Sequence, residues 1–155
     1  MKVRYVSHAS IQIVTDSGLR LLTDPWLHSP IYGNMMWQFP VCTLSMADYT
    51  AQDILHVSHD HPDHFCARTL RHFDRSLPVV IRRYEGVIDI KGKLKELGFK
   101  NIIELGHRES WTDPRGLTVT LLIDAGSTDS ATIISDGKQS VFNQNDCFLS
   151  EEDYR

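Results

Sequence analysis

Apolar and polar residues alternate with a period of two at the start of the chain, as in β-strands that bury one face. Three such segments follow one another, at residues 3–6, 11–14 and 19–22. The Asp16-Ser17-Gly18 sequence between the last two is typical of a tight turn. We therefore expect the chain to begin with a β-meander.

Strand and helix patterns alternate through the middle of the chain. Apolar runs predict strands at residues 54–57, 78–81 and 101–104. Helical patterns lie between them, at residues 66–73 and 90–97, and Gly98 closes the second helix. Strand patterns return at residues 117–123, 131–135 and 141–143. This order of elements predicts an α/β layered architecture.

The segment from Asp24 to about Asp53 has no regular pattern. Three prolines interrupt it, and aromatic side chains are concentrated between Trp26 and Phe39. Structureless loops of this length are uncommon in compact domains and are often functional. Either the loop covers a site, or its aromatic side chains fold back onto the core.

Composition limits the class of protein. A chain of 155 residues, 41% hydrophobic and 23% charged, fits one folded domain. The net charge of -4 provides no broad basic field, so we expect no nucleic-acid partner. The sequence contains no apolar run as long as a signal peptide or membrane span, which predicts a cytoplasmic protein. The three widely spaced cysteines are not typical of a disulfide framework.

The candidate chemistry is concentrated between Ser58 and His64, in the sequence SHDHPDH. Three imidazoles and two carboxylates within six positions are hard to explain structurally. The two-residue period of a strand would direct His59 and His61 to one side, and a turn would present Asp63 and His64 from another. Two pairs of ligands can serve two adjacent metal ions. Imidazole nitrogen and carboxylate oxygen suit zinc, iron or manganese.

The segment resembles the HxHxDH motif of the metallo-β-lactamase superfamily. Residues 7–10 (SHAS), 22–26 (LTDPW) and 145–147 (NDC) are similar to segments of one branch. That branch includes ascorbate-phosphate lactonases, N-acylphosphatidylethanolamine phospholipase D and CMP-N-acetylneuraminate hydroxylase-like proteins. The resemblance implies an αββα sandwich, of which residues 1–155 would form the N-terminal half and part of the second sheet.

The resemblance also implies roles for particular residues. His59 and His61 would bind the first of two divalent transition-metal ions, and Asp63 and His64 the second. Asp146 would bridge the two ions.

Three carboxylate and imidazole groups would assist the ligands. Asp24 would orient a ligand histidine, as carboxylates near metal-bound imidazoles commonly do. Asp63 and His8 would be catalytic, with His8 near the metals and the substrate. Without the resemblance, Asp24 is equally a turn residue and His8 a strand histidine facing solvent.

Two features depart from the family pattern. The family usually supplies a third histidine to the first metal, but this chain has no histidine after His107. Asp124 and Asp129 are the nearby replacements, and an aspartate would move the preference from zinc toward iron or manganese. The chain also ends at Arg155, before the half of the fold that supplies the last histidine. We therefore expect a domain that is incomplete at its C-terminus.

Three functions follow as hypotheses. In the first, metal-activated hydroxide attacks an ester, lactone or phosphodiester, which makes the protein a hydrolase. In the second, a di-iron centre makes it a hydroxylase-like oxidoreductase. In the third, the chain is a metal-binding half-domain completed by a partner chain or a homo-oligomer. The substrate is expected to be a small molecule, whose identity the sequence does not indicate.

Overall fold

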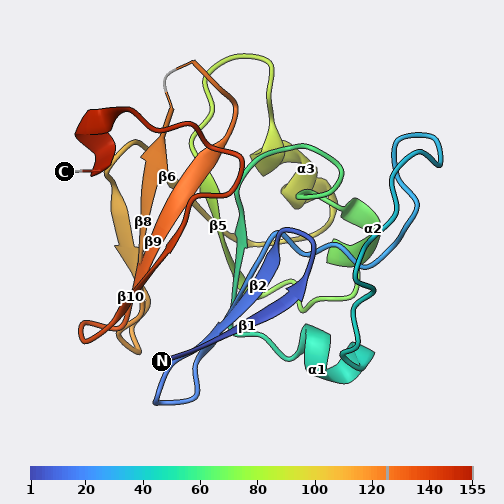
Figure 1. Cartoon of the computed structure of the whole chain (residues 1–155), viewed down its shortest axis with the longest axis horizontal. Coiled ribbons are helices and arrows are strands. Elements are labelled where there is room, and N and C mark those ends of the chain that lie inside the picture. Colours follow the sequence, from blue (N-terminus) through green and yellow to red (C-terminus); the bar gives the residue numbers. More distant parts are fainter. Residues whose placement is uncertain (125, 155) are drawn as a thin grey trace.

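The structure is a computed structural model that describes residues 1–124 and 126–154. It has three layers: a four-stranded sheet, a six-stranded sheet packed against it, and short helices on the far side of the second sheet (Figure 1). The α/β prediction is thus confirmed. Within the described residues the helical layer covers the six-stranded sheet.

The six-stranded sheet contains the first six strands in sequence order. Its strands are β1 (Lys2–Ser7), β2 (Ser10–Val14), β3 (Arg20–Thr23), β4 (Ile54–Val57), β5 (Pro78–Arg82) and β6 (Asn101–Leu105). β1, β2 and β3 pair antiparallel, which confirms the predicted meander. β3 to β6 pair parallel, so the carboxyl ends of β3, β4 and β5 meet at one edge.

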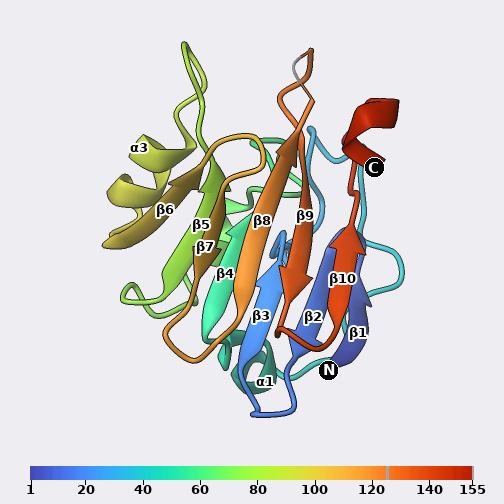
Figure 2. The ribbon, with the colours of Figure 1, turned by 90° about the vertical axis from the view of Figure 1, so that its left-hand side faces the viewer.

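The four-stranded sheet is antiparallel and has the order β10-β9-β8-β7. Its strands are β7 (Ser110–Thr112), β8 (Thr118–Ile123), β9 (Ser130–Ser135) and β10 (Ser140–Asn143). The patterns at residues 117–123, 131–135 and 141–143 predicted three of them. β7 escaped prediction because it has three residues and only one large apolar side chain. Figure 2 shows the two sheets stacked face to face, with β10 near β1.

The helices are short: α1 (Met46–Thr50), α2 (Ala67–Leu70), α3 (Ile90–Glu96) and the 3₁₀ turn η1 (Glu151–Tyr154). The prediction for α3 is right to within a residue. α2 is shorter than the helix expected over 66–73. α1 lies inside the segment expected to have no regular element. Its start is capped by the Ser45 hydroxyl, which accepts from the Asp48 amide.

Two cores hold the layers together, and neighbouring residues of one strand serve different cores. Leu21 of β3 faces the four-stranded sheet with Ile54, Val80 and Leu121, all fully buried. Leu22, the next residue, faces the helices. Side chains alternate across a strand, so β3, β4 and β5 in the middle of the six-stranded sheet bury apolar side chains on both faces. That burial fixes β3, β4 and β5, and thereby the loops at their carboxyl ends.

The outer face of the four-stranded sheet carries polar side chains where β7 and β8 pair. Hydroxyl pairs cross between its strands, Ser110 with Thr120 at 2.7 Å and Thr112 with Thr118 at 3.0 Å. Phe142 of β10 lies on the same face, opposite Ile133 of β9, and is 45% exposed. Exposed apolar side chains also occur at the open edge, where Val3 and Tyr5 of β1 are about half exposed.

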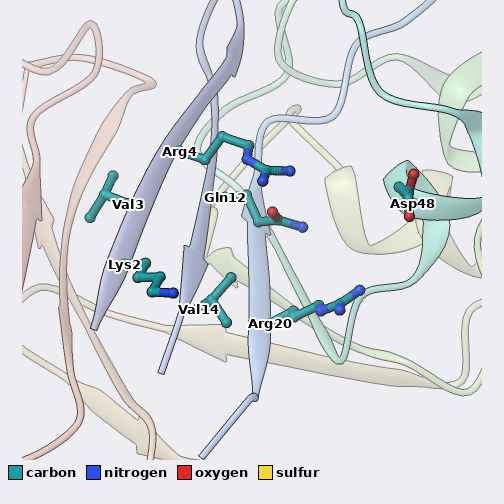
Figure 3. Close-up of a pocket in the computed structure, with 7 residues that line it drawn as sticks. All are labelled: Lys2, Val3, Arg4, Gln12, Val14, Arg20 and Asp48. Atoms are coloured by element: carbon teal, nitrogen blue, oxygen red, sulfur yellow. The ribbon is translucent and has the colours of Figure 1, made fainter. Parts of the chain in front are cut away.

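A groove of about 860 Å³ lies on the helix side of β1, β2 and β3. Figure 3 shows Arg4, Gln12 and Arg20 pointing from the strands toward the side where Asp48 of α1 lies. Its lining includes none of the residues from 58 to 64. Among the described residues, no helix has the length and apolar composition needed to span a membrane.

Candidate metal centre

The histidine-rich segment follows β4 directly and is not itself a strand. β4 ends at Val57, and the chain turns after His61, whose carbonyl accepts from the His64 and Phe65 amides at 2.9 and 2.7 Å. The two-residue period of a strand is therefore the wrong reason for expecting His59 and His61 together. The turn still brings His59 Nε2 to 2.8 Å from His61 Nδ1.

Asp129 joins these two histidines from the other sheet. His59 Nε2 lies 3.5 Å from Asp129 Oδ1, and one donor atom from each of His59, His61 and Asp129 falls within 4.8 Å of the others. Asp124 is in no such group, and its carboxylate accepts from the Gly126 amide at 3.0 Å. Ala125 lies outside the described residues. The geometry places Asp129, and not Asp124, beside the pair.

The other expected ligands converge next to this group. His64 Nε2 lies 3.4 Å from both Asp63 Oδ2 and Asp146 Oδ2. Asp146 also lies 3.9 Å from His59 Nε2, so it stands between the two sets of imidazoles. His8 Nε2 lies 2.9 Å from Asp63 Oδ2. Two overlapping groups, His59-His64-Asp146 and His8-Asp63-His64, each have donor atoms within 4.8 Å.

Asp24 is fully buried behind the imidazoles and is bonded on both oxygens. Oδ1 accepts from the Ser58 amide at 2.8 Å. Oδ2 lies 3.2 Å from His64 Nδ1 and accepts from Asn145 Nδ2 at 2.6 Å. His64 therefore has its Nδ1 engaged and its Nε2 directed at the acidic cluster, an orientation that a metal-binding imidazole needs.

Ser58 links the same network to the buried ring of His59. Its hydroxyl lies 3.0 Å from Asp24 Oδ2 and 2.9 Å from His59 Nδ1. His59 Nε2 is thus left to face Asp129 and Asp146. One buried hydroxyl and one buried carboxylate fix both rings.

The carboxylates make this end of the sheets strongly attractive to cations. Burial alone would lower the pKa of His64, but hydrogen bonds and charge from Asp24 and Asp63 raise it to about 10. Burial raises the pKa of Asp63, and the hydrogen bonds from His64 and His8 outweigh it and hold that pKa well below its usual range. Asp63 is therefore an anion near neutral pH.

Two residues hold the loop that carries Asp129 through hydrogen bonds: one is the last residue of β5, and the other follows β5 by two positions. Arg82 donates to the carbonyls of Ser127 and Asp129 at 2.6 and 2.8 Å. Tyr84 donates to the carbonyl of Thr128 at 2.9 Å. These bonds connect the two sheets at the candidate centre and fix the position of the Asp129 backbone relative to His59.

The backbone around the centre adopts an uncommon conformation. Of the six described non-glycine residues with positive φ, four surround the cluster: His8, Asp24, Tyr32 and Asn145, with φ between 41° and 56°. Such values are unusual for side chains other than Asn, Asp and His, and gather at functional sites. Tyr32 is the exceptional residue type, and its hydroxyl donates to Asp63 Oδ1 at 3.3 Å.

The predicted residues therefore come together: His8, Asp24, His59, His61, Asp63, His64, Asp129 and Asp146. Their roles as ligands or catalytic groups stay predictions. The donor set fits a transition metal, because imidazole nitrogens and carboxylate oxygens converge while the remaining ring nitrogens of His59 and His64 are engaged. Sequence reasoning missed Tyr32, Ser58, Arg82 and Tyr84. Only the position of Ser58 beside the motif could have indicated one of them.

Comparison with known proteins gives two kinds of relative. A protein of Mycobacterium tuberculosis named as a putative Rieske 2Fe-2S iron-sulfur protein is 34% identical over 160 residues, covering 94% of this chain and 30% of that protein. A CmlA beta-hydroxylase mutant has 26% identity and a TM-score of 0.65, over 90% of this chain and 29% of the other. The chain thus spans about a third of these relatives.

A third similarity concerns the fold alone. The structure of a possible metal-dependent hydrolase from Veillonella parvula has a TM-score of 0.76 and 17% identity, over 99% of this chain and 66% of that one. The profile of the family described as "Beta-lactamase superfamily domain" matches residues 2–152. Because this profile matches almost the whole chain, the chain belongs to the beta-lactamase superfamily. It shares its fold with the possible metal-dependent hydrolase from Veillonella parvula.

Proposed function

We propose that this chain is the metal-binding part of a hydrolase that acts on an ester, lactone or phosphodiester in a small-molecule substrate. The observation that carries the proposal is the Asp63 carboxylate, which is anionic, bonded to His8 and Tyr32, and placed beside His64. Hydrolysis needs a group that accepts a proton from water and donors that face developing negative charge. Asp63, His8 and Tyr32 supply both.

Two divalent transition-metal ions, zinc, iron or manganese, fit the donor set. His59, His61 and Asp129 would hold one, Asp63 and His64 the other, with Asp146 between them. Bound there, such ions lower the pKa of a water ligand and stabilise negative charge on the substrate. Asp24 and Ser58 keep His59 and His64 in the orientation that presents Nε2.

The chain's own groups would manage the proton. A carboxylate only accepts hydrogen bonds, so His8 presents its Nε2 proton to Asp63. The side chain of His8 is 27% exposed, so it connects Asp63 with solvent. His8 and Tyr32 would hold the Asp63 carboxylate in place while Asp63 accepts a proton from a water molecule.

A di-iron oxidoreductase is the second candidate, favoured by Asp129 beside His59 and His61. A carboxylate there makes the site richer in oxygen and moves its preference toward iron. The 26% identity to a beta-hydroxylase and the Rieske name of a relative support the same reaction class. The three cysteines of this chain join none of the His/Asp groups, so no Rieske cluster is proposed for it.

The domain of residues 1–155 is proposed to work with further polypeptide, either a partner chain or a second copy. The half-exposed Val3 and Tyr5 at the sheet edge support this, because exposed edges and apolar surface favour association. Light scattering of the purified chain tests it. We expect self-association, and a monodisperse monomer with turnover of about 1 to 1,000 per second would contradict it.

The reaction is tested by loading the protein separately with zinc, iron and manganese. We expect hydrolysis of ester, lactone or phosphodiester substrates, and its loss in Asp63→Asn. Oxygen consumption by the iron-loaded protein, without hydrolysis under any metal, would establish the oxidoreductase instead. Both assays should be run with the longest gene product that contains these residues.

A further inference from the structure

Two histidines outside the candidate centre face each other across two segments of the chain. His28 Nε2 lies 3.0 Å from His72 Nε2, and the ring centroids are 5.2 Å apart. His28 is partly exposed and His72 is exposed, so ions in solution can reach both rings. Neither residue belongs to the groups around His59 and His64.

The backbone beneath the pair is fixed on both sides. The Leu27 amide donates to the Thr69 hydroxyl at 2.9 Å, and Trp26 Nε1 donates to the His28 carbonyl at 2.8 Å. Trp26 and Thr69 are fully buried. The His72 amide in turn donates to the Thr69 carbonyl at 3.0 Å, at the end of α2. Thr69 thus bonds to His72 and to Leu27, the neighbour of His28, and Figure 1 shows the loop after β3 passing beside α2.

This separation suits two nitrogens on one metal ion. With metal–nitrogen bonds of about 2.0–2.1 Å, ligand nitrogens lie about 2.9 Å apart at a right angle and about 3.3 Å apart in a tetrahedron. We propose that His28 and His72 form a second, bidentate site for a divalent transition metal, Cu(II), Ni(II) or Zn(II), whose other positions water fills. Imidazole pairs suit these ions, and the right-angle geometry favours Cu(II) and Ni(II).

A metal in this position would tie together two segments of the main centre. His28 is four residues after Asp24, and His72 is eight residues after His64, while Asp24 and His64 lie 3.2 Å apart. An ion bound to His28 and His72 would link the segment of residues 24–28 to the segment of residues 64–72 at a solvent-exposed position. It would stabilise the folded chain, since it binds residues that only the fold brings together.

The competing explanation is a plain hydrogen bond between two neutral rings. Burial and the nearby charges of Arg68 and His72 lower the pKa of His28, so a proton competes weakly for this ring in either case. A hydrogen bond needs no metal and gives no added affinity for one. Metal stoichiometry therefore separates the two explanations.

The experiment compares the wild type with His28→Asn, His72→Asn and a control, His107→Asn, which removes an exposed histidine elsewhere, beside Asp153. Each protein is freed of metal with a chelator, dialysed against Cu(II), and measured by plasma emission and electron paramagnetic resonance. We expect the wild type and His107→Asn to hold one more copper ion than either variant of the pair. That ion should raise the Tm of these two proteins only.

Equal stoichiometry and equal Tm shifts in all four proteins would overturn the proposal. Loss in one variant of the pair but not in the other would also overturn it, because a bidentate site needs both rings. If one variant of the pair fails to fold, the copper stoichiometry and Tm shift of the other variant are compared with those of His107→Asn alone. The outcome is independent of the hydrolase proposal, since the residues of the main centre stay unchanged in every protein compared.

Discussion

The two sheets contribute different chemistry to the same end of the molecule. Every imidazole of the candidate centre comes from loops of the six-stranded sheet, after β1 or β4. The four-stranded sheet contributes carboxylates alone, Asp129 before β9 and Asp146 after β10. The first sheet therefore supplies the imidazole nitrogens together with the Asp63 carboxylate, and the second sheet adds two further carboxylates. If these groups bind metal, Asp129 and Asp146 would raise the oxygen content of the centre and so influence which metal it prefers.

The sheets also differ in how they are stabilised. The parallel strands β3, β4 and β5 of the six-stranded sheet are buried on both faces, whereas the four-stranded sheet presents hydroxyl pairs on its outer side. Loops on the first sheet are consequently held by two cores. Asp129 depends on individual hydrogen bonds from Arg82 and Tyr84. This difference predicts that substitutions of nearby surface residues disturb the loops of the six-stranded sheet less than the loop that carries Asp129.

The largest effect is expected when two of the three proposed nitrogen ligands are removed. Replacing both His59 and His61 with alanine should remove most of the bound metal, because only His64 and carboxylates, which are harder ligands, then remain. Plasma emission spectroscopy of the purified variant measures this. Full metal stoichiometry in the double variant would disprove the assignment of the centre.

The next effect concerns the core between the sheets. Leu121→Ala should lower the free energy of unfolding by about 2–5 kcal/mol, since the leucine is fully buried among residues of both sheets. The neighbouring Thr120→Ala removes only a hydroxyl pair on the outer face and should cost less than about 1.5 kcal/mol. Denaturant melts of both variants compare the two faces. Equal losses would contradict the difference drawn between them.

Removal of the Asp129 carboxylate should have the next largest effect, on metal affinity. Asp129→Asn should weaken metal binding by more than the roughly 10 to 100-fold typical of residues that only support a ligand. Asp124→Asn is the matched control, because its carboxylate is bonded to a backbone amide outside the cluster. Chelator competition measures both. A larger loss in Asp124→Asn would reverse the choice between the two aspartates.

The sequence predicted the parts of the centre that are close together in the chain. The motif from His59 to His64 could be found because its ligands lie within six positions. Asp24, Asp129 and Asp146 became candidates only through the family resemblance, since nothing local distinguishes them from turn residues. Arg82 and Tyr84 could not be found, because their partners are backbone carbonyls about 45 residues away. Such contacts leave no pattern in the sequence.

The smallest effect is expected at Asp24, which orients ligands without binding the metal. Asp24→Asn keeps the size of the side chain but replaces one oxygen by an amide that cannot accept from Ser58 or Asn145. The variant should fold and lose about 10 to 100-fold in metal affinity. Asp113→Asn, a buried carboxylate bonded to Arg115, is the control for burial alone. It should change the Tm without changing metal affinity. Unchanged affinity in Asp24→Asn, by titration against a chelator, would show that Ser58 and the fold orient His59 and His64 without this carboxylate.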